Sequence, residues 1–168
     1  MGLKARAVLK NKNMKNGFTL IEFLIVIAIM LFMSAVGLAM FSNLHGSTQL
    51  NENVLQIIQT LKIARERSVA SYNNSAHGVF LTITNPYKYV LYQGNSYVTR
   101  NASFDRGVIF DAALSLNTSD IVLTGGNIDI NFSQSSGQPN NTGTIIVTHN
   151  SATSRLIKIN SIGLVEEN

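Results

Sequence analysis

An apolar run of 24 residues, from Phe18 to Phe41, constrains this chain more than any other feature of the sequence. It follows a basic stretch, residues 1–17, that ends in Gly17, and the run itself holds one charged residue, Glu22. As a helix the run would be about 36 Å long, enough to cross a hydrocarbon layer of about 30 Å. We therefore predict a transmembrane helix over 18–41, with a cytoplasmic N-terminus because the preceding stretch is basic.

The charge of the chain changes at Gly17. The whole chain has 13 Lys and Arg and 9 Asp and Glu, which gives a formal charge of +4. Five of the cations precede Phe18, so the remainder has eight Lys and Arg against nine acids. The basic pI is thus mostly a property of the leader, and it is no argument for nucleic-acid binding by the rest of the chain.

Residues 15–22, which read Lys-Asn-Gly-Phe-Thr-Leu-Ile-Glu, resemble the N-terminus of type IV pilins and of type II secretion pseudopilins. The resemblance implies that a prepilin peptidase cuts after Gly17 and that Phe18 is then N-methylated. It also implies an inner-membrane protein whose β-domain is extracytoplasmic. Such a subunit leaves the lipid through an assembly platform and joins other pilin or pseudopilin subunits in a filament with these helices at its core.

Glu22 is the residue that this resemblance explains best. A charge in hydrocarbon costs about 2.5–3.5 kcal/mol on insertion scales and usually marks a functional site. In a filament core the carboxylate would pair with the new amine of Phe18 on a neighbouring subunit and so set the stagger between helices. The alternative is that Glu22 lies at the level of the cytoplasmic headgroups and is only solvated.

Two other interpretations of the N-terminus remain open. A secretory signal could be cut among the small residues of 35–39, although the apolar run is long for such a signal and holds an acid. The run could also be a plain anchor for an extracytoplasmic β-domain. Neither explains why glycine, phenylalanine and glutamate occur together at this spacing.

Beyond the apolar run the sequence predicts an α+β fold. Residues 42–71 continue the helix in amphipathic form, and seven positions follow its period: Leu50, Val54, Ile57, Ile58, Leu61, Ala64 and Ser68. The helix should end near Ser71. Whether it is continuous through Gly37 and Gly46 is left open by the sequence, because glycine weakens a helix.

Residues 72–168 are predicted to form an antiparallel β-domain that packs on this helix. Short segments between turn residues indicate the strands: 78–84, 87–92, 97–99, 107–110, 120–123, 128–132, 144–148, 155–159 and 163–165. The Ala64-Arg65 pair and the glycine-containing C-terminal run resemble the H-type, FimT-like minor pseudopilins. A minor subunit of a type IV pilus or of a type II secretion filament is therefore the leading interpretation.

No enzyme, cofactor or metal site is expected. The chain has no cysteine, and no Gly-x-Ser-x-Gly motif or phosphate loop. Its three histidines, His45, His77 and His149, are far apart in the sequence. FimT-like proteins suggest DNA capture as an alternative, for which four basic residues of the β-domain would be the contacts: Arg100, Arg106, Arg155 and Lys158. Nucleic acid is not an expected partner on charge alone, because phosphate binding needs clustered cations.

Overall fold

The computed structural model describes residues 18–110, 113–150 and 154–168, and it describes no side chains for residues 36–45. The chain divides into two compact units, Met1–Met40 and Phe41–Asn168, and each is considered by itself. Gly17 lies outside the described residues. Phe41 is described only by its helical backbone.

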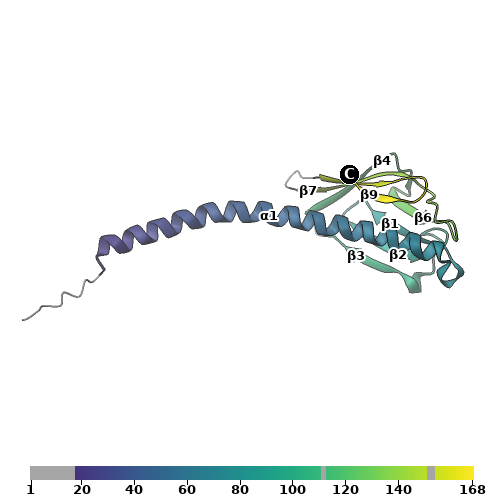
Figure 1. Ribbon diagram of the computed structural model, residues 1–168, viewed down its shortest axis with the longest axis horizontal. Helices are drawn as coiled ribbons and strands as arrows, with labels where there is room; N and C mark the ends of the chain where they lie inside the picture. Colours follow the sequence, from purple (N-terminus) through teal and green to yellow (C-terminus); the bar gives the residue numbers. More distant parts are fainter. Residues whose placement is uncertain (1–17, 111–112, 151–153) are drawn as a thin grey trace, which may run out of the picture. The chain divides into compact units, whose positions relative to one another are not determined.

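Helix α1 spans Leu20–Val69 (Figure 1). It has no proline, and its backbone is helical at both Gly37 and Gly46, which answers the question that the sequence left open. Gly46 has a packing reason instead. A Cβ atom there would lie 2.6 Å from Cε1 of His149, so only glycine lets the imidazole approach the helix this closely.

The end of α1 agrees with the prediction. Its last residue is Val69, and Ser71 adopts a left-handed conformation with φ of 49°. A short 3₁₀ helix, η1, follows over Tyr72–Asn74. The turn residues after the amphipathic segment therefore stop the helix where the sequence indicated.

The remainder of the Phe41–Asn168 unit forms two antiparallel sheets, so the predicted α+β class is confirmed. The first sheet has the strand order β3-β2-β1-β6-β5. Its strands are β1 (His77–Thr82), β2 (Lys88–Gln93), β3 (Arg106–Ile109), β5 (Leu123–Thr124) and β6 (Asn127–Phe132). A second short 3₁₀ helix, η2 (Ala102–Phe104), precedes the edge strand β3.

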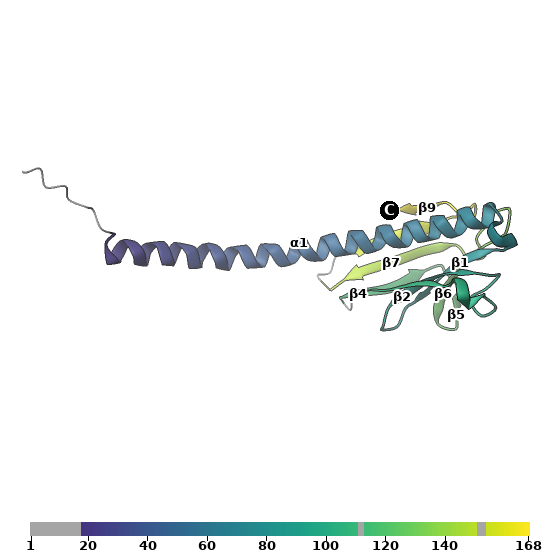
Figure 2. The ribbon, with the colours of Figure 1, turned by 90° about the horizontal axis from the view of Figure 1, so that it is seen from below.

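The second sheet has the strand order β4-β7-β8-β9. Its strands are β4 (Leu114–Ser119), β7 (Gly143–His149), β8 (Ser154–Ile159) and β9 (Val165–Glu167). Every neighbouring pair in both sheets is antiparallel. The two views show that the C-terminal half of α1 lies across both sheets (Figure 1; Figure 2).

One face of α1 forms the centre of the hydrophobic core. All seven positions predicted from the helical period are buried, including Ser68. They pack against inward-facing residues of both sheets, such as Leu81, Ile130, Ile145 and Ile157. Each large apolar side chain buried in this way contributes about 1.5–3 kcal/mol relative to its exposed state. The core therefore joins the helix to both sheets.

Several strand predictions were wrong in detail. Residues 97–99 form a bend and turn rather than a strand, and the predicted strand 120–123 shrinks to Leu123–Thr124. The last strand begins at Val165 rather than at residue 163. Strand β4 was not predicted, because its polar residues look like a turn; it forms because Leu114 and Leu116 are buried and β7 pairs with it.

A buried polar network explains the departure at 97–99. The Tyr92 hydroxyl donates to Oδ1 of Asp129 at 2.6 Å, and Asn131 Nδ2 donates to the Tyr92 hydroxyl at 3.1 Å. The backbone N–H of Tyr97 donates to the other Asp129 oxygen at 3.3 Å. The Tyr97 ring also stacks on Phe80 at 3.8 Å between centroids. The segment is therefore fixed by side-chain contacts instead of by a ladder of hydrogen bonds.

Arg65 connects three distant parts of the sequence. Its Nη2 donates to the Ile162 carbonyl at 3.2 Å, and its Nε is buried without a hydrogen-bond partner. A Cβ at Gly163 would lie 2.5 Å from the Gly137 carbonyl oxygen and 2.8 Å from Arg65 Nε. Arg65 therefore packs against two glycine-containing turns.

Candidate processing and assembly segment

Helix α1 begins with a capping box formed by Thr19 and Glu22. The Glu22 backbone N–H donates to the Thr19 hydroxyl oxygen at 3.3 Å, and the Thr19 backbone N–H donates to Glu22 Oε2 at 3.2 Å. The Thr19 hydroxyl also donates to the same carboxylate oxygen at 3.1 Å. Two N–H groups that a helix start leaves unpaired are satisfied, an arrangement worth about 1 kcal/mol.

The negative charge of Glu22 also suits its position. It lies in the first turn of α1, where the helix dipole favours an anion. Among the described residues, Glu22 Oε1 accepts no hydrogen bond. Oε2 of this exposed carboxylate is thus used within the chain, which leaves Oε1 able to accept a bond from a cation.

Sequence reasoning missed the role of Thr19. The residue lies in the apolar run, yet the spacing Thr-x-x-Glu before apolar residues is itself a signal for a helix start. The structure therefore adds an explanation for Glu22 that needs no second subunit.

The part of α1 that follows the cap, as far as Met33, is apolar on all sides. Phe18 is 80 % exposed, and the large apolar side chains that follow it are between 39 % and 78 % exposed. They are Leu20, Ile21, Phe23, Leu24, Ile25, Val26, Ile27, Ile29, Met30, Leu31, Phe32 and Met33. A helix that is hydrophobic all round normally belongs in a core or a membrane.

Ser34 does not interrupt this surface with an unpaired polar group. Its hydroxyl donates to the Met30 carbonyl at 2.8 Å, one turn back along the helix.

Across the described residues, no helix combines the length and the hydropathy that a membrane crossing requires.

The four basic residues considered for DNA contact lie in separate places. Arg100 forms an ion pair with Asp105 at 2.8 Å, and its guanidinium lies 3.7 Å from the Tyr97 ring centroid. The hydrogen bond to the Asp105 carboxylate is the main reason that the pKa of Arg100 is raised above its ordinary value. Arg106 is on the edge strand β3 of the same sheet.

The other two basic residues are on strand β8 of the second sheet. Arg155 lies 3.7 Å from a Glu167 oxygen and donates to Asn51 Oδ1 at 3.2 Å. Lys158 stands opposite Glu166 in the register between β8 and β9. The two cations of β8 therefore lie beside acidic residues of β9. They do not form one basic cluster with Arg100 and Arg106 of the first sheet.

The two histidines whose side chains are described, His77 and His149, have separate surroundings. His77 is buried, its backbone N–H donates to the Ser68 hydroxyl at 2.8 Å, and Ser68 returns a bond to the His77 carbonyl. Burial, with Arg67 nearby, lowers the pKa of His77. His149 packs against Gly46, and the side chain of His45 is not described. Within the described ranges no three His, Cys, Asp or Glu side chains gather as a metal site would require.

Comparison with known proteins adds one finding at the N-terminus. Residues 12–38 match the prokaryotic N-terminal methylation motif, a stretch that holds Gly17, Phe18 and the Thr19–Glu22 cap. No curated protein and no solved structure matches the chain. The match is confined to this N-terminal segment, so it identifies the methylation motif there and not the family of the whole chain.

Proposed function

We propose that the chain is a minor pilin or pseudopilin of a type IV pilus or a type II secretion filament. In this proposal a prepilin peptidase cuts after Gly17, Phe18 becomes the N-methylated first residue, and the helix 18–41 holds the subunit in the inner membrane before assembly. The observation that carries the proposal is the methylation motif on a capped helix whose apolar side chains are exposed.

The exposed apolar surface supports an anchor that later becomes a filament core. Each of its large side chains gains about 1.5–3 kcal/mol when it is removed from water. Lipid can cover the surface first, and the helices of other subunits can replace that lipid without a loss of apolar burial. The basic residues before Phe18 favour a cytoplasmic N-terminus and an extracytoplasmic β-domain. Lipid, the peptidase, the assembly platform and other subunits are then the partners.

Glu22 has two separable roles in this proposal. Within the chain it caps the helix through Oε2, which also fixes the direction of the carboxylate. Between chains, Oε1 accepts the Phe18 amine of a neighbour. Cleavage creates that amine and removes the five cations of the leader, so the amine becomes the main positive charge near the helix start.

Mass spectrometry of the mature N-terminus tests the processing step. We expect a chain that begins at Phe18 and carries one added methyl group. An intact leader would contradict the proposal and favour a plain anchor. A cut among residues 35–39 would contradict it too and favour a secretory signal.

Two variants separate the roles of Glu22. Glu22→Gln removes the charge but keeps a residue that the capping box accepts, whereas Thr19→Val removes the cap but keeps the charge. If the carboxylate pairs with a neighbouring amine, Glu22→Gln is excluded from filaments and Thr19→Val is incorporated. Equal loss for both variants, measured by sedimentation of sheared filaments and immunoblotting, would assign Glu22 to capping alone.

A further inference from the structure

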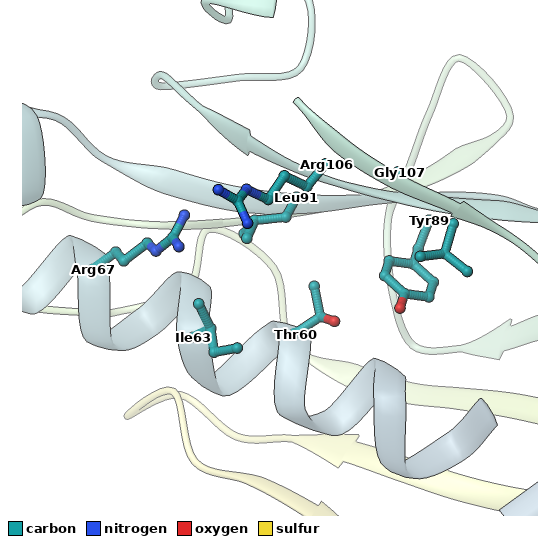
Figure 3. A pocket seen from close by; sticks show the side chains of 8 residues that line it. Thr60, Ile63, Arg67, Tyr89, Leu91, Arg106 and Gly107 are labelled. Carbon is teal, nitrogen blue, oxygen red and sulfur yellow. The ribbon is translucent and has the colours of Figure 1, made fainter. Parts of the chain in front are cut away.

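A pocket of about 220 Å³ opens between α1 and the edge of the first sheet. Ile63 and Arg67 line it from the helix, Tyr89 and Leu91 from β2, and Arg106 and Val108 from β3. Figure 3 shows Arg67 and Arg106 reaching toward the same end of the pocket from opposite walls, with Tyr89 at the other end. The pocket thus has a cationic end and an apolar end.

The strand register explains why both kinds of side chain face the pocket. Arg106 stands opposite Leu91, and Val108 stands opposite Tyr89. Residues directly opposite in an antiparallel pair have their side chains on the same face of the sheet. Leu91 and Tyr89 belong to the core that contains α1, so Arg106 and Val108 also face the helix.

The two arginines differ from Arg100 and Arg155 of the same unit. Arg100 and Arg155 have carboxylates beside them. Among the described residues, Arg67 and Arg106 form no ion pair; Arg67 has an aromatic contact, with its guanidinium 5.6 Å from the Tyr72 ring centroid. Two guanidinium groups at one end of a concave site favour an anion, and a carboxylate can be bound in bidentate fashion.

Strand β3 also has an open edge beside this pocket. It pairs with β2 on one side, and over the described residues no strand pairs with its other side. The Phe110 N–H donates to the Tyr87 carbonyl. Because hydrogen-bonded pairs alternate along an antiparallel ladder, the N–H and C=O groups of Gly107 and Ile109 point to the open edge. All four residues of β3 are exposed.

We propose that this edge and pocket together bind an extended segment of a partner protein. The segment adds a strand beside β3, with a carboxylate side chain opposite Arg106, where it also meets Arg67. Two positions away along the segment, an apolar side chain opposite Val108 enters the pocket toward Tyr89. The open edge favours a peptide over a small amphiphilic anion. Only a peptide can fill the pocket and also form hydrogen bonds with the backbone groups of Gly107 and Ile109. This recognition does not depend on which filament the subunit joins.

Fluorescence anisotropy with labelled heptapeptides tests the proposal on the full chain in detergent micelles. One peptide is Thr-Thr-Glu-Thr-Val-Thr-Thr and the other has Glu and Val exchanged, because the direction of the added strand is open. We expect saturable binding of at least one. Glutamine in place of glutamate in the peptide, or Arg106→Gln or Arg67→Gln in the protein, should weaken binding about tenfold or more, since each removes a charge-assisted contact.

Two matched controls isolate charge position and backbone pairing. Arg155→Gln removes a cation from the second sheet and should leave binding unchanged. Ile109→Pro removes an outward N–H and should abolish binding, whereas Ile109→Thr keeps that N–H and should retain it. Tyrosine fluorescence of each variant confirms that the fold is intact.

Three results would overturn the proposal. One is the absence of saturable binding for both peptides at millimolar concentration, and another is binding that is indifferent to Arg106→Gln. The third is full binding by a folded Ile109→Pro variant. Displacement of the peptide by decanoate together with that third result would assign the pocket to a small amphiphilic anion instead.

Discussion

Replacing Tyr92 with Phe tests whether the buried polar network holds the first sheet together. Tyr92 and Asp129 are 1 % and 3 % exposed, so water cannot replace the lost hydroxyl. The variant removes a hydrogen bond to a carboxylate, worth about 1.5–3 kcal/mol, and a neutral one from Asn131, worth about 0.5–1.5 kcal/mol. Asp129 keeps the Tyr97 N–H. The expected loss is about 2–4 kcal/mol of the unfolding free energy.

Urea unfolding in detergent micelles, followed by tyrosine fluorescence, measures this loss. All five tyrosines follow residue 41, so the signal reports the Phe41–Asn168 unit and not the apolar helix start. With an m-value of about 2 kcal/mol/M, the midpoint should fall by about 1–2 M. Tyr89→Phe is the matched control, because among the described residues the Tyr89 hydroxyl makes no hydrogen bond; it should change stability by less than about 0.5 kcal/mol.

The pH dependence gives a second readout of the same network. Burial, and then the hydrogen bond to Asp129, raise the pKa of Tyr92 above its ordinary value of about 10. The unfolded chain therefore loses this proton first, so the wild type loses stability as pH rises above about 10. The Tyr92→Phe variant lacks this titrating group, so its unfolding free energy should fall less than that of the wild type as pH rises above about 10. A double-mutant cycle with Asp129→Asn that showed no coupling, or a midpoint shift no larger than that of Tyr89→Phe, would refute the reasoning.

Three further predictions concern close packing and a buried histidine. Gly163→Ala should destabilise the unit by about 2–4 kcal/mol in the same urea assay, because φ is +79° and the new Cβ would meet Arg65. Gly46→Val should lower the thermal midpoint by at least about 4 °C, since the side chain would displace the His149 ring; an unchanged midpoint would mean that the ring moves freely. The lowered pKa of His77 means that the unfolded chain binds the proton first, so stability should be full above about pH 6.5 and fall below it. His77→Gln should flatten that slope, measured by urea unfolding at several pH values.

The sequence by itself determined the features that depend on neighbouring residues. The apolar run and the charge change at Gly17 are local patterns. The Thr-x-x-Glu spacing is local as well, because a helix start is stabilised by groups within one turn, although its role was recognised only in the structure. The buried face of α1 was also readable, because residues three and four apart lie on one side of a helix whatever covers them. These features suffice to predict a long helix that is apolar at its start and buries one face against the rest of the chain.

The tertiary structure decided what depends on residues far apart in the chain. Strand β4 exists because β7 pairs with it, and residues 97–99 are not a strand because Asp129 and Phe80 bind Tyr97 from the side. Arg65 is separated from Ile162 by 97 residues, and its local sequence resembles a solvated helix face. The pocket between Arg67 and Arg106 likewise appears only once β3 is placed beside β2. Pairing and close contact are set by packing over long sequence distances, and local periodicity carries no information about them.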